Sequence, residues 1–216
     1  MLIKTEGIIL TKKPRKEKSS LIYILTKNFG LIKAIAEGIR REDSKLLSIS
    51  EPGVYGKIVF IYEYNKYKLI TILPYKIPIK IFKKYPYTYL WALRILLFFN
   101  FYAVSEKFWN IVINLDKIIL KHPKGFRLWF IIKILEELGL EPNLTNCSKC
   151  NIKLKNNVYI KGSELFCEKC KMKGYLKIDP LEYKEILKFT KSNFPLSKHP
   201  PILKHLIKSH LKNLSL

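Results

Sequence analysis

Alternating apolar and polar positions in the first part of the chain predict β-strands. Five short runs rich in Ile, Val, Leu and Tyr are separated by polar turns that contain Gly or Pro. The runs are Leu2–Leu10, Leu21–Thr26, Leu31–Glu37, Val54–Tyr62 and Tyr67–Leu73. Five strands within residues 1–80 favour a small barrel of the oligonucleotide/oligosaccharide-binding (OB) type, although SH3-like barrels have similar strand counts.

From Thr88 onward the apolar positions recur at helical spacing and turn residues become sparse. This pattern predicts three helices, over Thr88–Val104, Ser105–Lys121 and Phe126–Leu138, and Gly139 and Pro142 end the third. The third helix is apolar on nearly every side, so we expect it at the centre of a helical domain.

Two further helices are predicted near the end of the chain. One covers Pro180–Thr190, and the other begins at Pro200-Pro201, where proline is tolerated in the first turn. In the last helix apolar residues recur three to four apart and face away from Lys204, Lys208 and Lys212. The predicted fold class is therefore α+β, with an OB-like barrel over residues 1–80 and a helical domain over residues 81–216.

All four cysteines lie between the predicted helices, as two Cys-x-x-Cys pairs separated by sixteen residues. They are Cys147, Cys150, Cys167 and Cys170, the candidate ligands of a metal ion. This spacing is typical of a tetrahedral zinc ribbon, predicted here over about residues 145–175, with Val158–Ile160 and Glu164–Phe166 paired as a hairpin. Two disulfides or a redox dithiol are alternatives, but without a secretory signal at the N-terminus we expect a reducing cytosol. Four thiolates leave no open coordination position, so one zinc ion would stabilise the fold and would not catalyse.

No arrangement of residues in the sequence predicts catalysis. The nine glycines form neither Gly-x-x-x-x-Gly-Lys nor Gly-x-Gly-x-x-Gly, and the three aspartates, Asp43, Asp116 and Asp179, are scattered singly. No His-x-Glu accompanies the cysteine pairs, as a zinc deaminase would require. The four histidines are expected at the surface or in packing. We predict that the protein is not an enzyme.

The charge of the chain indicates a polyanionic partner. Forty Lys and Arg residues against 17 Asp and Glu give a formal charge of +23. A genome that favours lysine codons would explain why only five of these basic residues are arginine, but not the shortage of acidic residues. Because lysine contacts phosphates more often than it reads base edges, we expect nucleic-acid binding without sequence preference.

Two connections between the predicted strands carry much of this charge, Lys12–Ser20 and Gly38–Leu46. Basic loops at the rim of a barrel can follow a phosphate backbone, although each could also be a solvated surface turn. The predicted phosphate contacts are Lys12, Lys13, Arg15, Lys16, Arg40, Arg41 and Lys45, with Lys33 on the third strand as a weaker addition.

Five aromatic residues near these loops could stack on bases: Tyr23, Phe29, Tyr62, Tyr64 and Tyr67. We expect most of them in the core or at a domain interface. The apolar stretch Tyr89–Val104 contains Arg94 and is short for a bilayer span, so it is predicted as a buried helix, and no membrane contact is expected.

Several stretches along nearly the whole chain resemble one known family. The first are Thr5–Leu10, Glu17 with Leu21–Thr26, and Phe29–Leu31, followed by Gly38, Arg40, Arg41, Ser44, Leu46 and Glu51-Pro52. Later come Leu135–Leu140 and Pro142, which lead into Cys147-Ser-Lys-Cys150. In their order and spacing these stretches are similar to the bacterial RecO family of DNA recombination and repair mediators.

The resemblance implies a function and partners. The protein would bind single-stranded and double-stranded DNA, anneal complementary strands, and act with RecR to help load RecA onto DNA coated by the single-stranded DNA-binding protein (SSB). The acidic tail of SSB would bind an apolar, lysine-lined groove on the helical domain. The expected location is the bacterial cytoplasm, in association with the nucleoid. An RNA-binding or ribosome-associated zinc-ribbon factor is the main alternative, and a nucleic-acid-modifying enzyme is the next.

Overall fold

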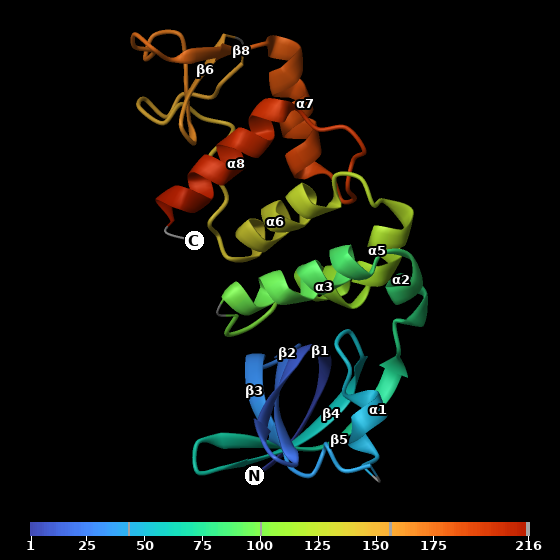
Figure 1. The fold of residues 1–216 in the computed structure, drawn as a ribbon. Helices are drawn as coiled ribbons and strands as arrows, with labels where there is room; N and C mark the ends of the chain where they lie inside the picture. Colours follow the sequence, from blue (N-terminus) through green and yellow to red (C-terminus); the bar gives the residue numbers. More distant parts are fainter. Residues whose placement is uncertain (43, 100, 156, 215–216) are drawn as a thin grey trace. The chain divides into compact units, whose positions relative to one another are not determined.

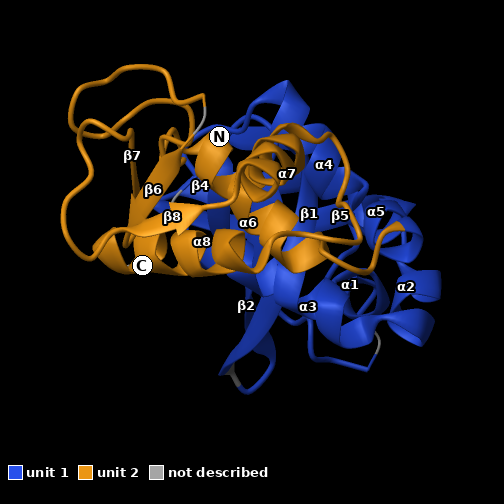
Figure 2. Ribbon diagram, turned by 90° about the horizontal axis from the view of Figure 1, so that it is seen from above, with its two compact units in different colours: residues 1–121 blue, residues 122–216 orange. Residues whose placement is uncertain are grey.

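The computed structural model describes residues 1–42, 44–99, 101–155 and 157–214, apart from the side chain of Lys16. The chain forms two compact units, Met1–Lys121 and His122–Leu216, coloured separately in Figure 2. Asp43 lies outside the described residues, as does the side chain of Lys16, one of the predicted phosphate contacts.

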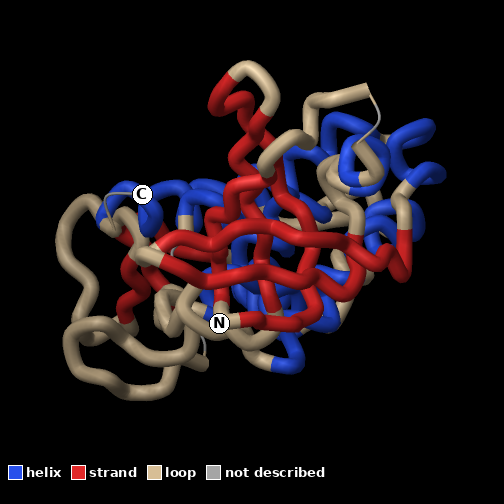
Figure 3. The backbone as a smooth tube through the Cα atoms, turned by 90° about the horizontal axis from the view of Figure 1, so that it is seen from below, coloured by secondary structure: helices blue, strands red, loops and turns tan. Residues whose placement is uncertain are grey.

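Five strands, red in Figure 3, form a closed barrel in the first unit, in the order β1-β2-β3-β5-β4. They are β1 (Leu2–Lys16), β2 (Ser19–Thr26), β3 (Gly30–Ala36), β4 (Tyr55–Glu63) and β5 (Lys66–Lys76). Neighbours are antiparallel, except that β3 and β5 close the barrel in parallel. The predicted five-stranded OB-like barrel is confirmed, within a mixed α+β chain.

Residues at alternate positions of β2 and β3 fill the barrel. Ile22, Ile24, Ile32 and Ala34 point inward and are at most 2% exposed, and they pack in one core with residues of the other three strands. Burying each large aliphatic side chain contributes about 1.5–3 kcal/mol. Tyr23 and Lys33 point to the opposite, outer face of the barrel, whereas Leu25 and Ile35 on these strands are also buried.

The first basic connection is a β-hairpin and not the open loop that we expected. β1 continues to Lys16, and Pro14 pairs with Ser20 of β2, so only Glu17 and Lys18 form the turn. Pairing of β1 with β4 ends at Ile8, which leaves one side of the later part of β1 without a partner strand. Proline is tolerated at such an edge because no ladder hydrogen bond is lost. Figure 2 shows this hairpin, near the label β2, projecting from the first unit.

Helices complete the first unit, but their bounds differ from the prediction. They are α1 (Leu46–Ile49), α2 (Ile79–Lys84), α3 (Pro86–Ile95), a 3₁₀ turn (Leu96–Phe98), α4 (Glu106–Ile113) and α5 (Leu115–Lys121). The helix predicted over Thr88–Val104 thus ends early, and the one over Ser105–Lys121 breaks at Asn114, whose side chain donates to the Asn110 carbonyl at 2.9 Å. No helix among the described residues has the length and apolar character to cross a bilayer.

These helices pack on the barrel, and Figure 1 shows α2, α3 and α5 at one end of it. The Tyr89 hydroxyl of α3 donates to the Gly53 carbonyl at 3.4 Å, and Lys76 at the end of β5 pairs with Asp116 of α5 at 2.7 Å. Residues 81–121 therefore group with the barrel, although we expected them in the helical domain. The domain boundary at residue 80 stays a prediction.

The second unit combines three helices with a small sheet. The elements are α6 (Phe126–Glu137), β6 (Val158–Lys161), β7 (Glu164–Phe166), β8 (Leu176–Ile178), α7 (Pro180–Lys191) and α8 (Pro201–Asn213). The predicted β6–β7 hairpin is confirmed, and β8, which was not predicted, adds to the other edge of β6. α6 is buried on most sides, and its Trp129 Nε1 donates to the Ser192 carbonyl at 3.1 Å. In α8, Leu203, Leu206 and Ile207 are buried while its lysines are exposed, as predicted.

Candidate nucleic-acid surface and metal site

The four cysteines form one cluster. All four are free thiols, and their Sγ atoms lie within 4.8 Å of one another. The Sγ atoms of Cys150 and Cys167 are 3.7 Å apart. A tetrahedral zinc ion with Zn–S bonds of about 2.3 Å would hold its sulfur ligands roughly 3.8 Å apart. The cluster therefore has the size and the donor set to bind a metal ion.

Backbone hydrogen bonds fold both cysteine pairs into tight turns. The Asn151 amide donates to the Cys147 carbonyl at 2.8 Å, and the amides of Cys170 and Lys171 donate to the Cys167 carbonyl at 3.1 Å. Asn151 has a φ of +56°, a conformation that asparagine tolerates better than most residues. The β6–β7 hairpin supports the first turn, because the Ser148 amide donates to the Leu165 carbonyl at 2.8 Å.

The thiols of the cluster differ in acidity. Burial raises the pKa of the Cys147 thiol, but hydrogen bonds from backbone amides, including those of Cys150 and Cys167, outweigh this and lower its pKa to about 6. Hydrogen bonding with the Cys150 thiol raises the pKa of Cys170 to about 12. Four thiolates this close repel one another, so a bound cation is needed for all four to be ionised.

The histidines lie elsewhere. The His122 ring stacks on Phe194, and the His199 ring packs edge-on against Phe189, with centroid separations of 5.8 and 5.7 Å. His210 Nε2 lies 2.6 Å from the Leu140 carbonyl oxygen. Within the described part of the chain, the cysteines are the only group of three or more potential ligands close enough to share a metal ion.

Most of the predicted phosphate contacts lie on the surface of the barrel unit. Lys13 and Arg15 are exposed on the projecting part of β1, and Lys33 is exposed on β3. Lys12 is less available, because its ammonium group forms an ion pair with Glu51. Arg40, Arg41 and Lys45 are all exposed in the connection that follows β3.

The two basic connections touch each other. The Arg40 amide donates to the Lys18 carbonyl in the β1–β2 turn at 3.3 Å, and the neighbouring Ile39 is only 1% exposed. A hydrogen bond of 3.0 Å from the Arg41 amide to the Gly38 carbonyl tightens the loop. The β1–β2 hairpin and the Gly38–Leu46 connection therefore form one surface, which we call the basic rim.

A second basic group surrounds Tyr23 on the outer face of the barrel. The ammonium nitrogens of Lys13 and Lys33 lie 5.6 and 5.7 Å from the centroid of the Tyr23 ring. Tyr23 and Lys33 are direct cross-strand partners, so both side chains point to the same face. These distances are within the range of cation–π contacts. The structure thus brings two predicted phosphate contacts together around one aromatic ring.

The expectation that most of the five aromatic residues are internal is wrong. Phe29 is 41% exposed, Tyr62 is 36% exposed and Tyr64 is 94% exposed. Tyr64 lies with Asn65 in the turn between β4 and β5. The sequence carried a signal for this, because Asn between two strand-like runs is typical of a hairpin turn, where side chains are exposed.

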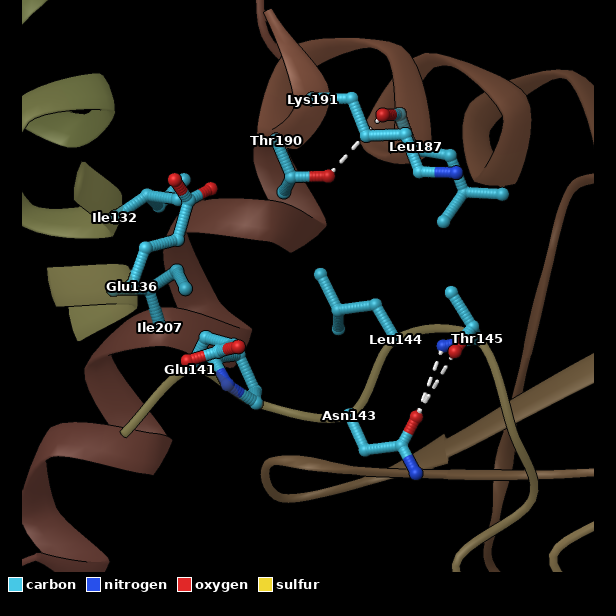
Figure 4. Close-up of a pocket in the computed structure, with 11 residues that line it drawn as sticks. Ile132, Glu136, Glu141, Asn143, Leu144, Thr145, Leu187, Thr190, Lys191 and Ile207 are labelled. Atoms are coloured by element: carbon cyan, nitrogen blue, oxygen red, sulfur yellow. Dashed lines mark hydrogen bonds between the residues drawn. The ribbon is translucent and has the colours of Figure 1, made fainter. Parts of the chain in front are cut away.

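The second unit contains a pocket of about 430 Å³, shown in Figure 4. Its apolar lining includes Ile132, Leu187 and Ile207, and its charged lining residues are Glu136, Glu141 and Lys191. Asn143 Oδ1 accepts hydrogen bonds from the amide and hydroxyl of Thr145 beside it. With two carboxylates and one lysine, this pocket does not match the lysine-lined groove that we expected for an acidic peptide.

Comparisons with known proteins agree with this architecture. Residues 1–73 match the family model described as "Recombination protein O N terminal", and residues 114–208 match "Recombination protein O C terminal". A "DNA repair protein RecO" from Thermodesulfovibrio yellowstonii is 29% identical over 175 residues, which cover 77% of this chain and 69% of that protein. The protein of the same name from Caldicellulosiruptor bescii is 28% identical over 204 residues, covering 89% of this chain and 82% of the relative. The chain belongs to the RecO family of DNA repair proteins.

Proposed function

We propose that the protein binds single-stranded DNA on its barrel, anneals complementary strands and, with RecR, helps to load RecA onto SSB-coated DNA. The observation that carries this proposal is the basic rim, where Arg40 and Arg41 are exposed and the Arg40 amide bonds to the β1–β2 hairpin. Membership of a DNA repair family makes DNA the expected polyanion.

Strand annealing needs a surface that reduces the repulsion between two phosphate backbones without holding the bases so tightly that pairing is blocked. Lysine-rich surfaces suit this because they contact phosphates as point charges and release bound counterions. The formal charge of +23 supplies a long-range attraction for both strands. The reaction requires no covalent chemistry, and we propose that the protein is not an enzyme.

We propose zinc as the metal of the cysteine cluster. Cys147, Cys150, Cys167 and Cys170 would hold it, because four thiolates in a tetrahedron are typical of structural zinc sites. When bound, the ion would offer no open position to a substrate, so its contribution would be the stability of the ribbon.

Further partners belong to the same proposal. Double-stranded DNA would contact the basic rim through its phosphates, and RecA would be affected indirectly through RecR. The acidic tail of SSB remains a proposed ligand, but we do not assign it to the pocket in Figure 4, because Glu136 and Glu141 would repel it. The proposed location is the bacterial cytoplasm at the nucleoid.

Fluorescence anisotropy with a labelled single-stranded oligonucleotide tests the binding surface. We expect Arg40→Glu with Arg41→Glu to weaken binding strongly and to reduce the slope of log K against log [salt] by about 1.4, since each single-strand phosphate contact contributes about 0.7. Replacement of Lys204 and Lys208 on α8 by Glu is the matched control, because both are exposed and the change in net charge is the same.

An equal loss in the control would mean that net charge alone governs binding, and it would remove the basic rim from the proposal. Tighter binding to structured RNA than to single-stranded DNA would favour the alternative of an RNA-binding ribbon protein.

A further inference from the structure

In the turn between β4 and β5, an exposed aromatic residue has a backbone conformation that is unfavourable for it. Tyr64 is 94% exposed and has a φ of +48°, and Asn65 follows with a φ of +58°. Two positive φ values are typical of a type I′ hairpin turn, in which Asn and Gly predominate and bulky residues are uncommon. Such a conformation costs about 1–3 kcal/mol for a residue like tyrosine, and a side chain this exposed gains little packing energy to offset it.

The hairpin holds the exposed ring on a firm support. The ring centroids of Tyr62 and Tyr67, on the two strands of the hairpin, are 4.8 Å apart. The Tyr67 ring also packs edge-on against the buried Phe60, with a centroid separation of 5.9 Å. The Tyr62 hydroxyl donates to Asn65 Oδ1 at 3.1 Å, across the turn. Figure 1 shows the β4–β5 hairpin extending away from the barrel. Tyr64 is therefore presented by a braced hairpin and does not sit on a loose loop.

Exposed lysines lie between this turn and the cluster of Lys13 and Lys33 around Tyr23. Strands β3 and β5 pair in parallel with Ala34 opposite Tyr67, so Lys33 and Lys66 come one residue earlier on adjacent strands. Both lysines are exposed, and Lys33 also lies over the Tyr23 ring at 5.7 Å. A polyanion that crosses β3 would thus pass Lys33 and Lys66 before it reaches the hairpin turn.

We propose that Tyr64 stacks on an unpaired base of single-stranded DNA whose phosphates are held by Lys33 and Lys66. This inference rests on the proposed function and adds to it a contact with a base. An exposed ring has a free face for a base, and stacking is tolerant of sequence because every base has such a face. Bases within a duplex are already stacked, so Tyr64 would favour single strands over duplex and would release a base once it pairs.

Three substitutions at Tyr64 distinguish the contribution of the ring from that of the backbone conformation. Tyr64→Ala removes the ring and Tyr64→Phe keeps it. Tyr64→Asn removes the ring but suits the positive φ, so this variant should fold at least as stably as wild type. Tyr102→Ala is the matched control, because Tyr102 is 88% exposed in the same unit. The probes are an oligo-dT strand and an abasic sugar-phosphate strand of the same length, both measured by anisotropy.

We expect Tyr64→Ala and Tyr64→Asn to bind oligo-dT between about 5-fold and 150-fold more weakly, while Tyr64→Phe and Tyr102→Ala bind like wild type. On the abasic strand all variants should bind equally, because the phosphate contacts are unchanged. If wild type binds oligo-dT and Tyr64→Asn binds it equally well, base stacking by Tyr64 is wrong while DNA binding stands. If folded wild type binds neither strand, the proposed function and this inference are both wrong.

Discussion

Gly53 joins the barrel to the helices of its unit through a contact that only glycine permits. Its φ is +85°, and a Cβ atom there would lie 2.5 Å from Cε1 of Tyr89, which is itself 1% exposed and has no room to move. We expect Gly53→Ala to lower the free energy of unfolding by about 1–2 kcal/mol for the backbone and a further 1–3 kcal/mol for overpacking.

Urea unfolding of full-length variants measures this difference. Gly38→Ala is the control in the same unit, because Gly38 has a φ of +66° but a Cβ atom there would come no closer than 3.7 Å to another residue. The control should lose only about 1–2 kcal/mol of unfolding free energy, the part that comes from placing alanine at a positive φ. Equal losses in the two variants would contradict the close contact between Gly53 and Tyr89.

Single residues could be predicted from the sequence where their chemistry is local. The four cysteine ligands follow from spacing alone, and the exposed Arg40 and Arg41 follow from a polar connection. The ion pair between Lys12 and Glu51 could not be predicted, because its partners are 39 residues apart and meet only when the barrel closes. The strain at Tyr64 also depends on the turn type, which the sequence indicates only through Asn65.

The four-cysteine ribbon is the element whose stability, on our proposal, would depend on one set of metal-binding side chains. We expect Cys147→Ser to lower the melting temperature of the His122–Leu216 unit by roughly 10 °C or more. Losing one ligand would remove several kcal/mol of the free energy of unfolding, and each kcal/mol changes the melting temperature of a domain of this size by about 4–8 °C. Calorimetry together with the bound zinc content measures the effect.

Affinity for single-stranded DNA per folded molecule should change little in this variant, because the basic rim belongs to the other unit. A variant that stays as stable as wild type would contradict the structural role of the metal, whatever its affinity for DNA.

At the scale of elements, strongly periodic segments could be predicted from the sequence, but the residues at which helices and strands end could not. The apolar helix α6 and the two-faced helix α8 were predicted because many residues repeat the same pattern. The end of β1 was missed because Pro14 and its basic neighbours look like a loop, and only pairing with β2 makes them a strand. The break at Asn114 was missed because the apolar period continues through it.

At the scale of the whole molecule, the charge pattern predicted a polyanionic ligand and the two basic connections that would contact it, but not how these connections come together in space. The barrel collects Lys13, Tyr23 and Lys33 from three different strands, and the Gly38–Leu46 connection docks beside the β1–β2 turn. These groupings arise from strand register, which the sequence does not determine by itself. They gather part of a general excess of charge into one local surface on the barrel unit.

The most direct test of this account is the annealing of two complementary labelled oligonucleotides, each first coated with the cognate SSB, followed by fluorescence quenching over a series of salt concentrations. The account predicts that the protein accelerates annealing and that the acceleration falls steeply as salt rises, because counterion release drives the contact. No acceleration at any salt concentration, with a folded and zinc-loaded protein, would contradict it.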